Sequence, residues 1–319
     1  MNIERYLDYS GRPDRLSGGA RRIPIDTPAG TFEVWTKRVG NNPDVQLLLL
    51  HGGPGATHEY FEAADSYLPA AGVEYYYYDQ LGSGRSDRPD EPSLWDLDRF
   101  VDEVEQVRRA LGLDRESLVV LGHSWGGILA IEYALAHQDH LRGLVISNMM
   151  ASAPAYTAYA HDVLMPAMDQ EVLAEILGFE QRGETDDPRY MALLFEHYYT
   201  EHTIRMPVTS WPDPVARGLG NINPKIYVPM QGPSEMGMSA EASLARWDRV
   251  DDLHRIQVPT LVIGAQYDTM DPAHMAMMAG RLPNGRYLHC PQGSHMAMYD
   301  DQETYFGGLV AFLRELAHG

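Results

Sequence analysis

The sequence predicts an α/β fold, in which helices flank a mostly parallel central sheet and one helical segment is inserted between two strands. Three observations support this prediction. Apolar runs at 45–50 and 117–122 are typical of strands buried on both faces, as in a parallel sheet. Segments with helical spacing of apolar residues, such as 94–111, separate the runs. Strands that alternate with helices imply a parallel sheet with helices on both faces.

The individual elements follow from local composition. Two early strands carry β-branched and aromatic residues around the turn TPAG at 27–30. The later strands are mostly apolar runs, and several end in glycine-rich turns. Strands are expected at 23–25, 31–39, 45–50, 73–79, 117–122, 141–148, 260–265 and 286–290. Helices are expected at 94–111, 125–137, 303–317 and, with weaker patterning, near 161–178 and 188–203.

The texture of the chain changes at 149–250, where Met, Pro and Tyr are frequent. We interpret this region as an insertion between two core strands. The expected organisation is a core formed by 1–148 and 251–319, with 149–250 as a helical cap. Such a cap would lie over the carboxyl ends of the strands, where open α/β sheets bind their ligands.

Composition argues against several classes of protein. The 319 residues include 25 Lys plus Arg and 45 Asp plus Glu, so the net charge is 25 − 45 = −20. This charge disfavours binding to nucleic acid or to anionic lipid, and it either serves solubility or attracts a cationic ligand. One cysteine, Cys290, cannot form an internal disulfide or a multi-cysteine metal site. No secretory signal or membrane span is recognisable, so a cytoplasmic location is expected; the oligomeric state stays open.

The strongest chemical signal is LGHSWGG at 121–127, which contains the pattern G-x-S-x-G. A nucleophilic serine needs a sharp strand-to-helix turn that exposes its hydroxyl, and glycines avoid clashes on either side. The pattern follows an expected strand and precedes an expected helix. Ser124 is therefore the predicted nucleophile.

A second signal, HGGPG at 51–55, follows the strand 45–50. A serine hydrolase needs two backbone N–H groups directed at the oxyanion that develops during attack. One is expected from Trp125, directly after the nucleophile. Gly53 is the expected second donor, because Pro54 has no N–H. His51 is expected to support this loop through hydrogen bonds.

The acid and the base should follow the serine in chain order. Asp268 lies just past the strand 260–265, whereas Asp271 precedes a proline and is expected to cap a helix. Among thirteen histidines, His295 lies after the last strand and before the final helix, so it is the predicted base. The triad Ser124, Asp268 and His295 would act through an acyl-enzyme without metal or cofactor. Cys290 is read as a buried thiol.

Together these residues resemble the proline iminopeptidase family of α/β-hydrolases, especially its branch similar to the tricorn-interacting aminopeptidase. The resemblance is carried, in order, by HGGPG at 51–55, DQLGSGRS at 79–86, GHSWGG at 122–127, HTIRMPVTSWPDP at 202–214, QGPSE at 231–235, GAQYD at 264–268 and GSH at 293–295. It implies removal of N-terminal residues, often proline, from short peptides. It also implies activity on amino-acid amides or arylamides.

The resemblance further implies that glutamates of the cap bind the free α-ammonium of the substrate. By its position in QGPSE, the resemblance makes Glu235 the candidate here. A partly desolvated carboxylate pairs strongly with a cation, which suits that role. The related branch has a glutamate directly after the triad acid, where this chain has Thr269. Glu196 and Glu201 are candidate replacements. An amino-acid amidase or carboxylic-ester hydrolase on the same scaffold is the alternative function. Many family members also have glycine in place of His123.

Overall fold

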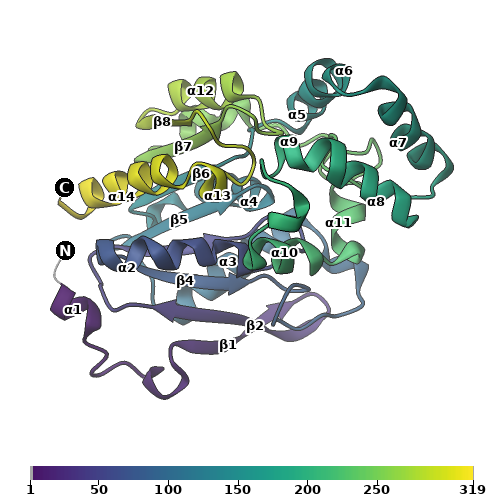
Figure 1. The fold of residues 1–319 in the computed structure, drawn as a ribbon. Coiled ribbons are helices and arrows are strands. Elements are labelled where there is room, and N and C mark those ends of the chain that lie inside the picture. The colour runs from purple at the N-terminus through teal and green to yellow at the C-terminus, as the bar shows by residue number, and fades with distance from the viewer. Residues whose placement is uncertain (1–2, 319) are drawn as a thin grey trace.

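The structure is a computed structural model, and it describes residues 3–318 (Figure 1). Within that range, eight strands form one sheet in the order β1-β2-β4-β3-β5-β6-β7-β8. β2 is antiparallel to both β1 and β4, and all other neighbouring strands are parallel. The predicted α/β class is therefore confirmed. The strands are β1 (Ala20–Thr27), β2 (Gly30–Val39), β3 (Gln46–Leu50), β4 (Glu74–Asp79), β5 (Leu118–His123), β6 (Gly143–Ser147), β7 (Thr260–Ala265) and β8 (Gly285–Cys290).

The central strands are buried along their whole length, because both faces of the sheet are covered. Successive side chains of a strand point to opposite faces. Leu48 and Val120 accordingly belong to the core on one face, while Leu47 and Val119 belong to the core on the other. Strands covered on both sides read as continuous apolar runs, which is the pattern that the sequence shows.

Helices cover both faces of the sheet. The cluster on one face includes residues of α3 (Leu97–Leu111), α4 (Trp125–His137) and α12 (Pro272–Arg281). The cluster on the other includes residues of α2 (Leu68–Ala71) and α14 (Gln302–His318). Two short helices lie outside the inserted region as well: α1 (Ile3–Leu7) at the start of the described chain and α13 (Ala297–Asp300) directly before α14. The expected helix 94–111 begins later, at Leu97, because the Asp96 side chain accepts from the N–H groups of residues 98 and 99.

The residues between β6 and β7 form helices that gather beyond one end of the sheet (Figure 1). Those within residues 164–199 share a small apolar core of their own, which includes Ile176, Tyr190 and Leu193, whereas buried apolar residues at 153–156, 215 and 226–230 belong to the clusters on the two faces of the sheet. The helices are α5 (Ala153–Tyr159), α6 (Met165–Ala167), α7 (Gln170–Arg182), α8 (Pro188–Leu194), α9 (Thr200–His202), α10 (Asp213–Gly220) and α11 (Pro224–Met230).

One of the two helices expected in this region is interrupted. Met168 has an extended backbone with ψ 163°, which ends α6 within the expected helix 161–178. Asp169 then begins α7, because its carboxylate accepts hydrogen bonds from the next turn. The expected helix 188–203 is present as a continuous helical run through α8, a π-helical turn at Phe195–Tyr199, and α9.

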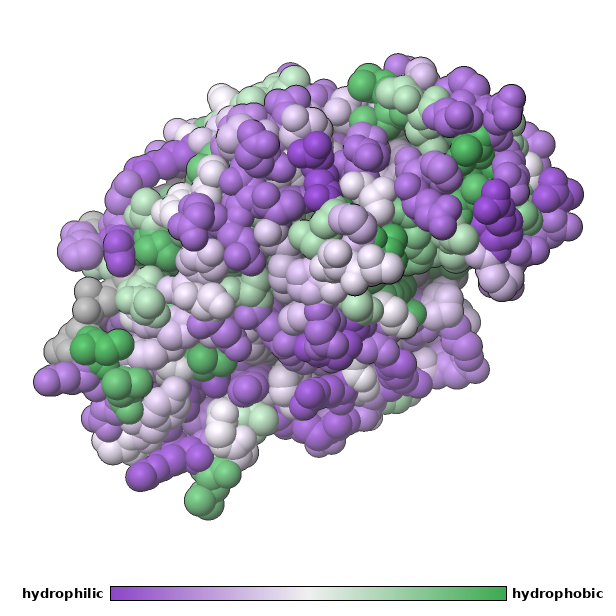
Figure 2. Space-filling model, in the orientation of Figure 1, coloured by the Kyte–Doolittle hydropathy of each residue, from purple (hydrophilic) through white to green (hydrophobic). Residues whose placement is uncertain are grey.

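The face of the molecule seen in Figure 2 is mostly hydrophilic, with apolar residues dispersed over it. None of the helices within residues 3–318 has both the length and the apolar character needed to cross a bilayer. Among the residues that the structure describes, the exposed large apolar side chains are Ile3, Leu7, Leu16, Val163, Val208, Val228 and Tyr267.

Candidate active site

Ser124 lies in a sharp turn between β5 and α4, as the motif requires. Its backbone dihedrals, φ 57° and ψ −130°, are strained for a residue that carries a side chain. A Cβ atom at Gly122 would overlap the carbonyl oxygen of Gly126, and one at Gly126 would overlap that of Leu50. Glycine is therefore required at both positions. The turn has the strand–turn–helix geometry that presents a nucleophilic serine.

Asp268 and His295 follow the neighbouring strands β7 and β8 and form a buried pair. His295 Nδ1 lies 2.7 Å from Asp268 Oδ1. Because a carboxylate accepts, Nδ1 donates and Nε2 is the nitrogen available as a base. Burial by itself lowers the pKa of His295, but the charge and hydrogen bond of Asp268 outweigh it and leave that pKa above its usual value.

Asp271 has the capping role expected of it. Its Oδ1 accepts a hydrogen bond of 2.8 Å from the backbone N–H of Ala273, at the start of α12. Pro272 occupies the first turn of that helix. The two acids of this segment thus have different roles: Asp268 contacts His295, and Asp271 caps α12.

The glycine-rich loop after β3 lies against the serine, and a Cβ atom at Gly52 would be 2.8 Å from that of Ser124. His51 Nδ1 is 2.9 Å from the carbonyl oxygen of Gly52, while its Nε2 accepts at 3.1 Å from the backbone N–H of Gln80. Nδ1 is therefore the protonated nitrogen. Since a trans peptide directs its C=O and N–H oppositely, this bond orients the N–H of Gly53.

The side chain of Gln80 joins this loop to the serine turn. Its Nε2 donates to the carbonyl oxygen of His51 at 2.9 Å, and its Oε1 accepts from the Trp125 indole at 2.8 Å. Trp125 is the first residue of α4, whose initial N–H groups have no partner within the helix. One amide thus connects the segments that carry both expected oxyanion donors, Gly53 and Trp125.

Ser124, His295 and Glu235 line a narrow cavity of about 30 Å³. Among the described residues of its wall, Glu235 is the one carboxylate. A larger cavity of about 370 Å³ shares the wall residues Thr203, Leu219, Ile222 and Glu235 with it. The further lining of this second cavity is largely apolar and aromatic, with Met191, Phe195, Tyr199, Pro224, Tyr227 and Val228 among its members.

Glu235 is half-buried and held among tyrosines. Its Oε1 accepts a hydrogen bond of 2.5 Å from the Tyr227 hydroxyl. Its carbonyl oxygen accepts from Tyr156 at 2.7 Å and from Tyr198 at 3.2 Å. Burial raises the pKa of the Glu235 carboxyl, and this effect exceeds the opposing effects of His295 and Tyr227. A bound cation would compensate for that burial.

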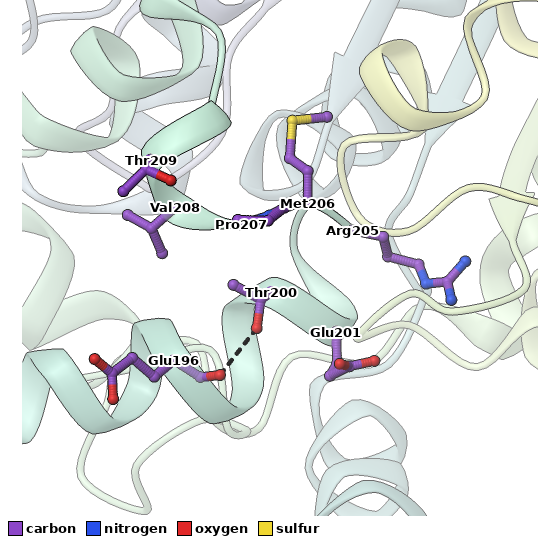
Figure 3. Close-up of a pocket in the computed structure, with 8 residues that line it drawn as sticks. All are labelled: Glu196, Thr200, Glu201, Arg205, Met206, Pro207, Val208 and Thr209. Atoms are coloured by element: carbon purple, nitrogen blue, oxygen red, sulfur yellow. Dashed lines mark hydrogen bonds between the residues drawn. The ribbon is translucent and has the colours of Figure 1, made fainter.

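Glu196 and Glu201 lie elsewhere. They line an open cavity of about 550 Å³ with Arg205 and Thr200, and none of its wall residues belongs to the cavity at Ser124 (Figure 3). In Figure 3 their carboxylates point away from each other. The structure therefore does not bring either glutamate to the serine.

Thr269 occupies the position directly after Asp268, the expected triad acid. Its hydroxyl is buried, 3.3 Å from Asp268 Oδ1 and 3.3 Å from His295 Nδ1. It does not line the cavity at Ser124 among the residues described. The hydroxyl therefore contacts the acid–base pair and not the space beside the nucleophile.

One group with metal-ligand chemistry exists within residues 3–318, formed by Glu105, His137 and His140. It lies at the end of α4 opposite to Ser124. Glu105 already accepts hydrogen bonds from Arg108, Arg109 and Tyr133. Two guanidinium groups on the same carboxylate disfavour a metal cation there.

Comparison with known proteins identifies the fold and the family of the chain. The model of the alpha/beta hydrolase fold family matches residues 46–302. A proline iminopeptidase of Elizabethkingia meningoseptica is 53% identical over 92% of this chain and 98% of its own length. The chain belongs to the proline iminopeptidase family. Among solved structures, VinJ has a TM-score of 0.85 at 29% identity, with 93% of this chain and 99% of VinJ covered. The proline iminopeptidase of Mycobacterium smegmatis has a TM-score of 0.79 at 28% identity, covering 93% and 98% of the two chains.

Several residues at this family site were not singled out from the sequence. Asn148 donates to Asp268 Oδ2 at 2.7 Å, and its only signal was a polar residue at the end of an apolar strand. Gln80 lay inside the matched motif DQLGSGRS without an assigned role. The tyrosines around Glu235 come from three separate helical segments, α5, the π-helical turn Phe195–Tyr199 and α11, so no local pattern predicts their meeting.

Proposed function

We propose that the protein is a serine aminopeptidase that releases N-terminal residues, with proline favoured, from short peptides, amides or arylamides. The observation that carries this proposal is the position of Glu235, which lines the same narrow cavity as Ser124 and His295. Relatives named proline iminopeptidases support the preference for a peptide with a free amine. The region 149–250, which supplies Glu235, serves in this proposal as the cap.

The reaction follows from the residues in that cavity. His295 Nε2 removes the proton of the Ser124 hydroxyl as Ser124 Oγ attacks the carbonyl carbon of the first residue. The N–H groups of Gly53 and Trp125 stabilise the resulting oxyanion. Asp268 holds the imidazole in its tautomer and stabilises its positive charge. His295 then protonates the leaving amine, and the C–N bond breaks to leave an ester on Ser124. Water, deprotonated by His295, hydrolyses that ester and regenerates the serine.

Glu235 supplies selectivity in this scheme. The free α-ammonium of the substrate would pair with its carboxylate, and the surrounding hydroxyls would exclude water from the pair. A substrate that lacks the ammonium would leave the carboxylate buried without a counterion. Blocking the amine should therefore impair binding.

A second candidate is an amino-acid amidase or carboxylic-ester hydrolase. The observation that favours it is Thr269, whose hydroxyl contacts the acid–base pair where the related branch has a carboxylate. With one carboxylate in the described wall of the narrow cavity, amine recognition depends on Glu235 alone.

A substrate panel separates the two candidates. It should contain proline and alanine arylamides, the same compounds with acetylated amines, proline amide, and simple p-nitrophenyl esters. The aminopeptidase proposal predicts that acetylation lowers kcat/KM by about 100-fold or more, because a buried carboxylate is left unpaired. Equal cleavage of free and acetylated compounds would refute it. Faster turnover of esters than of every arylamide, with no effect of acetylation, would favour the second candidate.

A further inference from the structure

His123 directly precedes the nucleophile, and the reaction scheme gives it no role. Its side chain is buried, with 1% of the residue exposed. The ring lies between two others: its centroid is 4.9 Å from that of His295 and 5.2 Å from that of Tyr60. A histidine in this place is either core filling or a hydrogen-bonding link between its neighbours.

The hydrogen bonds of His123 have one consistent direction. Its Nε2 is 2.8 Å from the main-chain carbonyl oxygen of His295, which can only accept, so Nε2 carries the proton. Burial, and secondarily the charge of His295, lower the pKa of His123 to about 3, so the ring is neutral and Nδ1 holds a lone pair. Nδ1 then accepts from the Tyr60 hydroxyl at 3.2 Å.

The Tyr60 hydroxyl continues the chain of hydrogen bonds. Its oxygen accepts from the backbone N–H of Gly52 at 2.5 Å. The sequence of donors is thus Gly52 N–H to Tyr60, Tyr60 O–H to His123, and His123 Nε2–H to the carbonyl of His295. Each donor has an acceptor and none is left over, which is the condition for a buried polar network to be rigid.

This series of hydrogen bonds joins residues at the carboxyl ends of three different strands. Gly52 belongs to the loop after β3 that carries the expected oxyanion donor Gly53. His123 ends β5 next to Ser124, and His295 lies in the loop after β8. The relative position of these loops decides whether base, nucleophile and oxyanion donor meet around one carbonyl carbon.

We propose that His123 is a positioning residue. Together with the Tyr60 hydroxyl, it fixes the loop at 51–55 and the loop that carries His295 in their positions relative to Ser124. The proposal rests on the proposed serine-hydrolase function and adds a residue to it. On its other side, the His295 loop is held by the end of α9, since the His295 N–H donates to the carbonyl of His202 at 2.9 Å. Without His123, the main chain of His295 would keep its hydrogen bond to His202 in the inserted region and lose its hydrogen bond to His123 in the core.

The variants should separate the hydrogen bond to Gly52 at one end of this series from the hydrogen bond to His295 at the other. His123→Ala removes both bonds, whereas His123→Gln places an amide N–H near the position of Nε2 and keeps a donor for the His295 carbonyl. Tyr60→Phe removes one oxygen and breaks the link to Gly52. Tyr299→Phe is the matched control, because the Tyr299 hydroxyl donates at 2.8 Å to the main-chain oxygen of Tyr60 and lies outside the link.

The readout is kcat and KM for a p-nitrophenyl ester without an amine, so that Glu235 is not involved. We expect His123→Ala and Tyr60→Phe to lower kcat by about 10- to 100-fold with KM changed less than about threefold, because misplaced catalytic groups affect the transition state more than binding. His123→Gln should recover most of the loss of His123→Ala, and Tyr299→Phe should retain the kcat of the parent. The double variant His123→Ala/Tyr60→Phe should be no slower than the slower single variant, because both changes break one chain.

Wild-type kcat in both His123→Ala and Tyr60→Phe would overturn the proposal, as would additive losses in the double variant. Loss of kcat in Tyr299→Phe equal to that in Tyr60→Phe would reduce the effect to packing and would also overturn it. If His123→Ala does not fold, the Tyr60→Phe and Tyr299→Phe pair decides alone. Failure of the proposed function gives a different result: hydrolysis retained by Ser124→Ala would refute the nucleophile itself.

Discussion

Asn148 Nδ2 donates a hydrogen bond of 2.7 Å to Oδ2 of Asp268, the carboxylate whose other oxygen accepts from His295. The amide cannot turn around, because Nδ2 also donates to the main-chain oxygen of Ser294 at 3.2 Å, and both of its partners can only accept. Asn148 itself has a positive φ of 51°, a conformation that asparagine tolerates better than most residues. Asp268 is therefore oriented by a residue that directly follows β6 and lies outside the proposed triad.

We expect Asn148→Ala to lower kcat by about 10-fold, because the catalytic carboxylate loses one of its fixed partners. Asn148→Asp should be worse, since a second carboxylate would face Asp268 and disfavour its charged form. The measurement is kcat for an ester and an arylamide, with thermal unfolding as the control for folding. An Asn148→Asp variant as active as the parent would contradict this role.

Asp268 and Asp271 offer a matched pair of substitutions. Asp268→Asn should lower kcat by about 10⁴-fold, because an amide can donate to Nδ1 and stabilise the wrong tautomer of His295. Asp271→Asn should leave both kcat and stability close to those of the parent, since asparagine is a good N-cap. Asp271→Ala should cost about 1 kcal/mol of stability and leave kcat intact. Similar losses of kcat from both asparagine variants would remove the distinction between triad acid and cap.

Ser124 and Cys290 are likewise distinguishable. Ser124→Ala should abolish turnover, because it removes the nucleophilic hydroxyl. The thermal unfolding transition should stay near that of the parent, because alanine differs from serine by only this one group. Burial raises the pKa of the Cys290 thiol, so it should stay unmodified by iodoacetamide in the native protein. Mass spectrometry and residual activity after treatment test this. Inactivation that follows modification of Cys290 would point to a thiol in the reaction.

Glu235→Gln should raise KM for free-amine substrates by about 10- to 100-fold and change KM for esters little, because a neutral amide cannot pair with an ammonium. Glu196→Gln and Glu201→Gln are the controls, since both residues line a different cavity. The burial that raises the pKa of Glu235 also predicts a pH effect. As pH falls through that raised pKa the carboxylate is lost, so KM for free-amine substrates should rise at a pH above the usual 4.5 for glutamate.

The pH profile of ester hydrolysis should report His295. The base must be neutral, and Asp268 keeps the pKa of His295 above its usual 6.5 despite burial. kcat/KM should therefore fall as pH decreases through a value above 6.5. The limb should follow one proton, because burial lowers the pKa of His51 to about 4 and that of His123 to about 3. A limb with two protons, or a midpoint well below 6.5, would contradict this electrostatic description.

The central sheet could be predicted from sequence because its strands are buried on both faces and so are continuous apolar runs. The pair of Asp268 and His295 could be proposed because chain order and strand ends restrict the choice to a few residues. The break at Met168 was missed because Asp169 begins a new helix within an apolar pattern that by itself continues. Capping of this kind acts through single hydrogen bonds, which periodicity does not detect.

The location of Glu196 and Glu201 was beyond the sequence for a different reason. Both lie in a helical run whose sequence does not indicate which face of the helix is directed toward the sheet. The series of hydrogen bonds from Gly52 to His295 joins residues that are up to 243 positions apart in the sequence. Contacts over such separations depend on how the strands are ordered in the sheet, and strand order cannot be read from local patterns.

Only 7% of the surface of Ser124 is exposed, and the cavity beside it is about 30 Å³ in volume. A peptide bond within a folded protein cannot reach such a serine, because its own neighbouring chain would collide with the walls. A loose chain end, which has no further chain on one side, can be threaded inward. Under the proposed mechanism, the small space beside Ser124 thus selects by the position of a bond in the chain: a bond next to a free chain end can be cleaved, and a bond within a folded protein cannot.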